Sequence, residues 1–535
     1  MTGIVLHWIV TNVPALLPVF IVIFISAIFV LIYLYRTAEM MNKKILAWLM
    51  ISFTAIFVTA IGYYLIKNRP PHVDFRLQIF PMYSEAGSPD SDWPAKQLWD
   101  AVSNELIHSV HDRAIVSPAD WTASLTANDS AVSIDHFKNL SLKIGGDFFL
   151  TGSQKREPSV ATLTWKVYNS KTGEVVVQEA QPVIAEKLAE DSHRICVKIL
   201  AGLNSSIEAK SLAIAQTTPE NFQNYWAARE RFDQEKYGES AVLAAQVVSL
   251  DSNFVPALVL SGKSWFFAAL AKKKSGASPV EEFDHTRNYF TRAMVLDSTQ
   301  AEAMALLGEY YIYQERWSLA EHHLLNSFRL NPHYPRLYLT MSRLHPFRYK
   351  KIGFDTERQL FQRAIFIDPC YEDGYLMLSD HYLFDNKREK AIESLERYLV
   401  INPDAVPVLT ALGRLYVVRN DMMKIVEVYD KIIALQPNNS DAFYNLGILY
   451  YNSEDLETSE KLLQRAIAID NHLNAHLFLA FLYEARGDRE KAIEHFRYRI
   501  RNRKGLEDEF AEEARKHLFI LVNQDSTQQK TNEQP

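Results

Sequence analysis

The chain has 535 residues, 48% of them hydrophobic, and a formal net charge of -7; at roughly 150 residues per domain this length allows three or four domains. The acidic balance and the absence of a long basic run argue against nucleic acid as a partner, because such binding depends on clustered Lys and Arg. With only two cysteines, Cys196 and Cys370, the sequence excludes a disulfide framework and a Cys-based zinc site. We expect both to be buried free thiols rather than a bridged pair.

Two apolar segments follow a short N-terminal segment, residues 1–12. Residues 13–35 contain no Asp, Glu, Lys or Arg, and residues 45–66 form a second apolar run. Each matches the ~20 residues that cross a bilayer as a helix. No basic stretch precedes the first run and no small-residue cleavage site follows it, so we expect two transmembrane helices in contact with the lipid bilayer rather than a signal peptide.

The loop between these runs, residues 36–44, sets the predicted orientation. It carries Arg36, Lys43 and Lys44, whereas no Lys or Arg precedes the first run. The positive-inside rule places such a loop in the cytoplasm. We therefore predict a two-pass protein of the bacterial inner membrane with the bulk of the chain on the periplasmic side.

Residues 73–210 predict a small α/β domain. Alternating apolar residues indicate strands, and apolar residues three or four apart indicate helices. The predicted order is β-α-β-α-β-β-β-α, with strands near residues 75–81, 114–116, 148–153, 161–168 and 175–179 and helices near 94–110, 134–144 and 184–203.

Two stretches of this domain carry a family resemblance. Residues 145–153 (GGDFFLTGS) and 167–176 (VYNSKTGEVV) resemble a strand and hairpin of the TolB amino-terminal-type domain. That resemblance implies a domain just outside the membrane and before repeats, as in CadC-like membrane-bound regulators. Those regulators carry a winged-helix domain before the membrane, which residues 1–12 cannot supply, so DNA binding is not implied.

Residues 145–149 (GGDFF) also differ by one residue from the GGDEF motif of diguanylate cyclases. In that family the carboxylates of the motif hold the magnesium that neutralises the triphosphate. Here Phe148 replaces the Glu. We interpret the segment as a glycine turn that leads into an apolar strand.

Four helix-ending dipeptides organise the second half of the chain. Asn331-Pro332, Asp368-Pro369, Asn402-Pro403 and Gln436-Pro437 recur at intervals of 37, 34 and 34 residues. This period resembles the tetratricopeptide (TPR) repeat, a pair of helices that stacks into a solenoid. The expected fold class is therefore mainly α: two transmembrane helices, a small TolB-like α/β domain and about eight TPR repeats over residues 222–522. The tail, 523–535, is expected to be disordered.

Two insertions interrupt the repeat spacing, and one more helix follows the last repeat. About twelve extra residues around 272–279 and three around 349–354 are expected to lengthen turns between the helices of a repeat. Residues 507–522 predict a further amphipathic helix that covers the open end of the solenoid.

In a TPR solenoid the first helix of each repeat lines the concave face. Mixed charge with Tyr is typical of protein-binding surfaces, because Tyr supplies contact area with a polar tip. The candidate partner-binding residues at these positions are Glu309, Tyr313, Arg343, Asp380, Arg414, Tyr444, Tyr451 and Glu484.

Motifs of catalysis and cofactor binding are missing. The sequence has no phosphate loop, no dinucleotide fingerprint and no His-Glu-x-x-His, and the adjacent pair His322-His323 points in two directions on a helix. We expect no enzyme activity, cofactor or metal. The predicted function is a membrane-anchored scaffold that binds a protein or peptide on its concave face. The alternative is a sensor component of membrane signalling that acts through another membrane protein. The sequence leaves the oligomeric state open.

Overall fold

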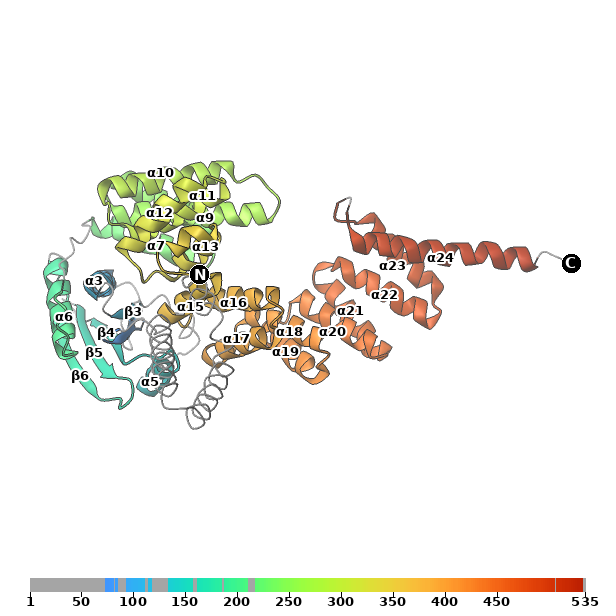
Figure 1. Cartoon of the computed structure of the whole chain (residues 1–535), viewed down its shortest axis with the longest axis horizontal. Helices are drawn as coiled ribbons and strands as arrows, with labels where there is room; N and C mark the ends of the chain where they lie inside the picture. Colours follow the sequence, from blue (N-terminus) through green and yellow to red (C-terminus); the bar gives the residue numbers. More distant parts are fainter. Residues whose placement is uncertain are drawn as a thin grey trace, which may run out of the picture. The chain divides into compact units, whose positions relative to one another are not determined.

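The computed structural model describes residues 73–80, 82–84, 93–110, 114–117, 133–156, 161–184, 187–209, 217–505 and 507–532. Figure 1 draws the helices and strands of these ranges, all of which fall in the unit Phe75–Pro535. The predicted transmembrane segments 13–35 and 45–66, the loop 36–44 and the lipid contact lie outside the described residues.

The predicted fold class is wrong in its membrane part. Across the described ranges no helix combines the length and the apolar character needed to cross a bilayer. The two longest helices there illustrate the reason: α9 (Val255–Lys274) ends in three lysines, and α24 (Glu509–Asn532) carries charged residues over much of its length. The described chain is mainly helical, with an α/β domain followed by a TPR-like solenoid.

The α/β domain is built on one mixed sheet. Its strands are arranged in the order β3-β1-β4-β5-β6, with β2 beside β4; β1 is parallel to β3 and β4, and β5 is antiparallel to β4 and β6. The elements are β1 (Arg76–Ile79), β2 (Tyr83–Ser84), α3 (Trp93–Val110), β3 (Ile115–Ser117), α5 (Ile134–Lys143), β4 (Phe148–Arg156), β5 (Ala161–Asn169), β6 (Val175–Pro182) and α6 (Leu188–Gly202).

Alternation along the strands gives the sheet two apolar faces. Leu163 and Trp165 of β5 pack with α3 and α6 in one core, which also contains Cys196. Phe149 of β4 packs with α5 in a second core, which Ile401 of the solenoid joins. The solenoid thus helps to cover the second face of the sheet. Both cysteines are free thiols, and burial raises the pKa of each.

The Gly145-Gly146 turn sits where α5 leads into β4. Gly145 has a φ of 74°, a conformation that favours glycine. A Cβ on Gly146 would lie 1.6 Å from Oε1 of Gln78. The Asp147 carboxylate accepts a hydrogen bond from the backbone N–H of Arg76 at 3.0 Å. These contacts give the segment a structural role where β4 begins beside β1, inside the sheet.

Eight successive helix pairs form the solenoid in the described range 217–505 (Figure 1). The pairs are α7 (Pro219–Asp233) with α8 (Tyr237–Leu250), α9 with α10 (Val280–Leu296), α11 (Ala301–Tyr313) with α12 (Trp317–Leu330), α13 (Pro335–Ser342) with α15 (Glu357–Ile367), α16 (Glu372–Phe384) with α17 (Arg388–Ile401), α18 (Val406–Arg419) with α19 (Met422–Leu435), α20 (Ser440–Asn452) with α21 (Leu456–Asp470) and α22 (Leu473–Arg486) with α23 (Arg489–Arg501).

The two insertions have different outcomes. The residues around 272–279 extend both helices of their repeat, so that α9 has 20 residues and α10 has 17, rather than lengthening only the turn as predicted. The residues around 349–354 include the end of a short extra helix, α14 (Pro346–Lys350), in the connection between α13 and α15. Continued helical backbone satisfies the inserted N–H and C=O groups internally, which an open turn would leave to water.

The last helix, α24, packs on α23 and closes the final core. Ala514 and Leu521 of α24 are buried in that core. Arg499 of α23 and Asp508, just before α24, form a buried ion pair at 2.6 Å. Helix α24 continues to Asn532, so most of the predicted disordered tail is helical.

Candidate partner-binding site

Small residues in the first helix of each pair allow the second helix to approach closely. A Cβ on Gly308 would lie 2.6 Å from Cγ of Leu324, and one on Gly447 would lie 2.8 Å from Cγ of Leu463. No larger residue fits there without displacement. First helices of neighbouring pairs also contact one another, as α9 does with α11 and α20 with α22.

The residue that follows each small residue has the same register in every repeat. We call these eight residues the inner row. They are Arg229, Lys263, Glu309, Arg343, Asp380, Arg414, Ile448 and Phe481. Six of them are charged, so the binding properties of this surface depend on whether each charge is already paired within the chain.

The first two members of the inner row are paired within the chain. Nη1 of Arg229 lies 2.7 Å from Oδ2 of Asp100, which belongs to α3 of the α/β domain. Nζ of Lys263 lies 2.8 Å from Oε1 of Glu302 at the start of α11. Helix α3 and the first helices enclose a cavity of about 450 Å³ beside these pairs.

Glu309 is the centre of a buried network. Its side chain accepts hydrogen bonds from Nε and Nη2 of Arg336 at 2.9 and 3.0 Å, and only 6% of the residue is exposed. Burial opposes the charge of Arg336, but the Glu309 carboxylate outweighs it, so the pKa of Arg336 is raised. Arg343 lies 3.8 Å from Glu309 and 4.4 Å from the ring centre of Tyr313. Three predicted site residues therefore meet in one network.

Asp380 and Arg414 differ from the earlier members of the inner row. Both are exposed, and neither forms an ion pair or a side-chain hydrogen bond with the described residues. Partial burial raises the pKa of Asp380. Beside them lie two partly exposed apolar side chains, Met377 at 38% and Val417 at 48%. This is the part of the inner row whose charges have no ion-pair partner within the described chain.

The predicted tyrosines lie at an aromatic end of the surface. The ring centres of Tyr444 and Tyr451 lie 5.8 and 6.0 Å from that of Phe478. Burial raises the pKa of Tyr444 to about 12. Glu484 is hydrogen-bonded to Nδ1 of His517 in α24 at 2.8 Å, which ties it to the last helix.

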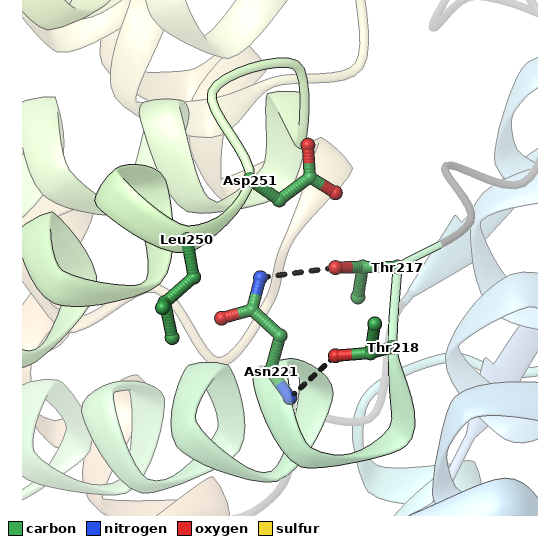
Figure 2. A pocket seen from close by; sticks show the side chains of 5 residues that line it. All are labelled: Thr217, Thr218, Asn221, Leu250 and Asp251. Atoms are coloured by element: carbon green, nitrogen blue, oxygen red, sulfur yellow. Dashed lines mark hydrogen bonds between the residues drawn. The ribbon is translucent and has the colours of Figure 1, made fainter.

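A second cavity, of about 380 Å³, lies at the start of α7 (Figure 2). Its polar groups cap the helix: the backbone N–H of Asn221 donates to Oγ1 of Thr218 at 3.2 Å, and Nδ2 donates to Oγ1 of Thr217 at 3.0 Å. Leu250 and Asp251 complete the lining. The polar groups that line this cavity therefore have a structural role at the start of α7. Within the described ranges no cluster of three or more His, Cys, Asp or Glu side chains could hold a metal ion.

Sequence reasoning missed several residues of this surface. Arg229 and Lys263 follow Ala228 and Gly262 in the same register as Glu309, so the repeat alignment contained the signal. The repeat alignment gave no signal for Arg336, because its role depends on the contact between one repeat and the next. Phe478, which joins the two tyrosines, is likewise identified by packing alone.

A family model matches within the solenoid. Residues 428–461 match the tetratricopeptide repeat. The matched segment contains α20 with Tyr444 and Tyr451, together with parts of α19 and α21. The chain therefore carries the TPR repeat that its spacing predicts. No curated protein matches the chain. The resemblance to the TolB-type domain is not tested by these comparisons and stays a prediction.

Solved structures with similar folds cover parts of the chain. MamA is 22% identical over 29% of this chain and 91% of its own, with a TM-score of 0.26. YrrB, described as a TPR protein with an unusual peptide-binding site, is 18% identical over 35% of this chain and 95% of its own, with a TM-score of 0.26. Yeast Tom70 is 14% identical over 60% of this chain and 69% of its own, with a TM-score of 0.42. These low values assign no function to the chain.

Proposed function

We propose that the chain is a protein-interaction scaffold whose inner solenoid surface binds a protein or peptide segment. The observation that carries the proposal is the pair Asp380 and Arg414, two exposed and opposite charges in equivalent positions without ion pairs among the described residues. A partner can supply the missing counter-charges, and no ion pair within the chain has to break for it to do so. The proposal includes no catalytic step.

The aromatic end of the same surface supports this function. Tyr444 and Tyr451 are partly exposed and held by Phe478. Rigid, amphipathic side chains of this kind add contact area while losing little side-chain freedom on binding. The inner-membrane location and the alternative role as a sensor component stay predictions from the sequence.

Site-specific crosslinking in the native cells tests the proposal. A photoreactive residue replaces Met377 or Val417 on the inner surface, or Val295 on the second helix α10, which is 81% exposed. We expect Met377 and Val417 variants to capture the same discrete partner and the Val295 variant to capture none. Equal adducts at all three positions, or none at any of them, would contradict the scaffold proposal.

A further inference from the structure

The first part of the inner surface is already in contact with the α/β domain. Asp100 of α3 forms an ion pair with Arg229, and Asn104 and Ile107 of the same helix line the 450 Å³ cavity together with Lys263 and Arg336. Docking of a partner over these residues would have to displace α3. A partner is therefore directed to the first helices that follow, α16 and α18.

On each of these two helices an exposed apolar residue lies about one turn from the exposed charge. Met377 lies three residues before Asp380 on α16, and Val417 lies three residues after Arg414 on α18. Residues three apart share one side of a helix, so each exposed charge has an exposed apolar neighbour. One helix offers an anion and the other a cation.

Helix spacing sets the length of a ligand that bridges the two charges. Packed helices lie about 8–10 Å apart. An extended chain of polyproline II form advances about 3.1 Å per residue and completes a turn every three residues, whereas side chains three residues apart in a β-strand face opposite ways. Two side chains three residues apart on a polyproline II segment therefore face the same side and span about 9 Å. A shorter spacing fails to reach, and a helical ligand would place residues at this separation only about 4.5 Å apart along its axis.

We infer that α16 and α18 form the docking site for an extended peptide segment of polyproline II form, with one basic and one acidic side chain about three residues apart and an apolar side chain between them. The basic group pairs with Asp380, the acidic group pairs with Arg414, and the apolar group packs on Met377 and Val417. This inference rests on the proposed scaffold function and adds the chemistry of the partner.

An array of nine-residue peptides tests the charge pattern directly on the full chain. The peptides carry Leu at the centre, flanked by Lys and Glu, by two Glu or by two Lys, at separations of two to five residues. We expect the wild-type chain to prefer the mixed pair at a separation of about three. Asp380→Lys should shift the preference to two acidic residues and Arg414→Glu to two basic residues, each by about tenfold in affinity, about 1.4 kcal/mol.

Controls separate this result from a general charge effect. Glu427→Lys on α19 and Lys390→Glu on α17 change exposed charges on second helices, and both should retain the wild-type preference. The fold of each variant is checked by circular dichroism and thermal unfolding.

Binding that ignores both charge reversals would overturn the inference, and so would the absence of binding to every peptide of the array. The scaffold function would survive either result if the crosslinks from Met377 and Val417 still captured one partner. Loss of those crosslinks, by contrast, would remove the scaffold function itself.

Discussion

The earlier and later parts of the solenoid use the same repeat position in different ways. Glu309 and Asp380 both follow a small residue in a first helix, yet Glu309 is buried in an ion pair with Arg336 whereas Asp380 is exposed without one. Register in a repeat therefore locates a residue without assigning its role. The residues that the next repeat places opposite it determine that role.

The next repeat explains the difference in physical terms. Arg336 stands 27 residues after Glu309, and the equivalent position after Asp380 is Pro407, which has no charge to offer. Asp441 stands 27 residues after Arg414, but its carboxylate contacts His472 at 3.0 Å. Free charges remain where the sequence of the following repeat fails to neutralise them.

The largest expected effect is a loss of stability in the earlier region alone. Glu309→Gln removes the carboxylate that pairs with the guanidinium of Arg336; because Glu309 is buried and Arg336 is 21% exposed, we expect a cost of about 2 kcal/mol or more. Asp380→Asn in the later region should change the free energy of unfolding by less than about 0.5 kcal/mol. Urea unfolding followed by circular dichroism measures both. Equal losses in the two variants would refute the contrast between the regions.

Acid should weaken both regions through one buried histidine, His476, and one half-buried histidine, His323. Burial lowers the pKa of His476 in α22 to about 4, and burial does the same for His323 in α12. Their pKa in the unfolded chain is about 6.5. The unfolded state binds more protons between these values, so stability present above pH 6.5 is lost as the pH falls towards 4.

For His476, of which 7% is exposed, this loss amounts to about 2–3 kcal/mol. Hydrogen exchange at pH 7 and pH 4.5 resolves the two regions. His476→Asn should reduce the acid sensitivity of α22 and α23 and leave that of α12 as it is. An acid response in α22 that the substitution leaves unchanged would count against this assignment.

Packing, unlike charge, should be equivalent in the two regions. Gly308→Leu and Gly447→Leu each force a side chain against a leucine of the second helix, an overpacking that costs about 1–3 kcal/mol. Gly238→Ala is the control, because its Cβ meets open space. Thermal unfolding compares the three variants. A Gly447→Leu variant as stable as Gly238→Ala would show that the repeat register is wrong.

The smallest expected effect concerns the contact of α3 with the solenoid. Asp100 and Arg229 are partly exposed, with 27% and 26% of their side chains accessible, so their coupling should be no more than about 1 kcal/mol. A double-mutant cycle with Asp100→Asn and Arg229→Gln measures it by urea unfolding. A coupling near zero would mean that shape and apolar contacts, such as that of Ile401 with the other face of the sheet, hold the α/β domain on the solenoid.

Local patterns predicted much of this molecule. The small residues Gly308 and Gly447 identified close helix pairs, because only a small side chain fits there, and alternation in 161–169 identified a buried strand. The extension of α9 was missed, because Lys272 to Lys274 resemble a solvated loop when viewed without their helix. The pairing of Glu309 with Arg336 was missed for a different reason: it is a contact between repeats, which periodicity within a repeat does not encode.

Hydrogen–deuterium exchange of the full chain, with and without the tightest-binding peptide of the array, tests the central claim most directly. The claim is that the later part of the inner surface receives the partner while the earlier part is engaged within the chain. It predicts slower exchange in α16 and α18 on peptide binding and unchanged exchange in α7, α9 and α11. Protection of α7, α9 and α11 with no change in α16 and α18 would contradict it.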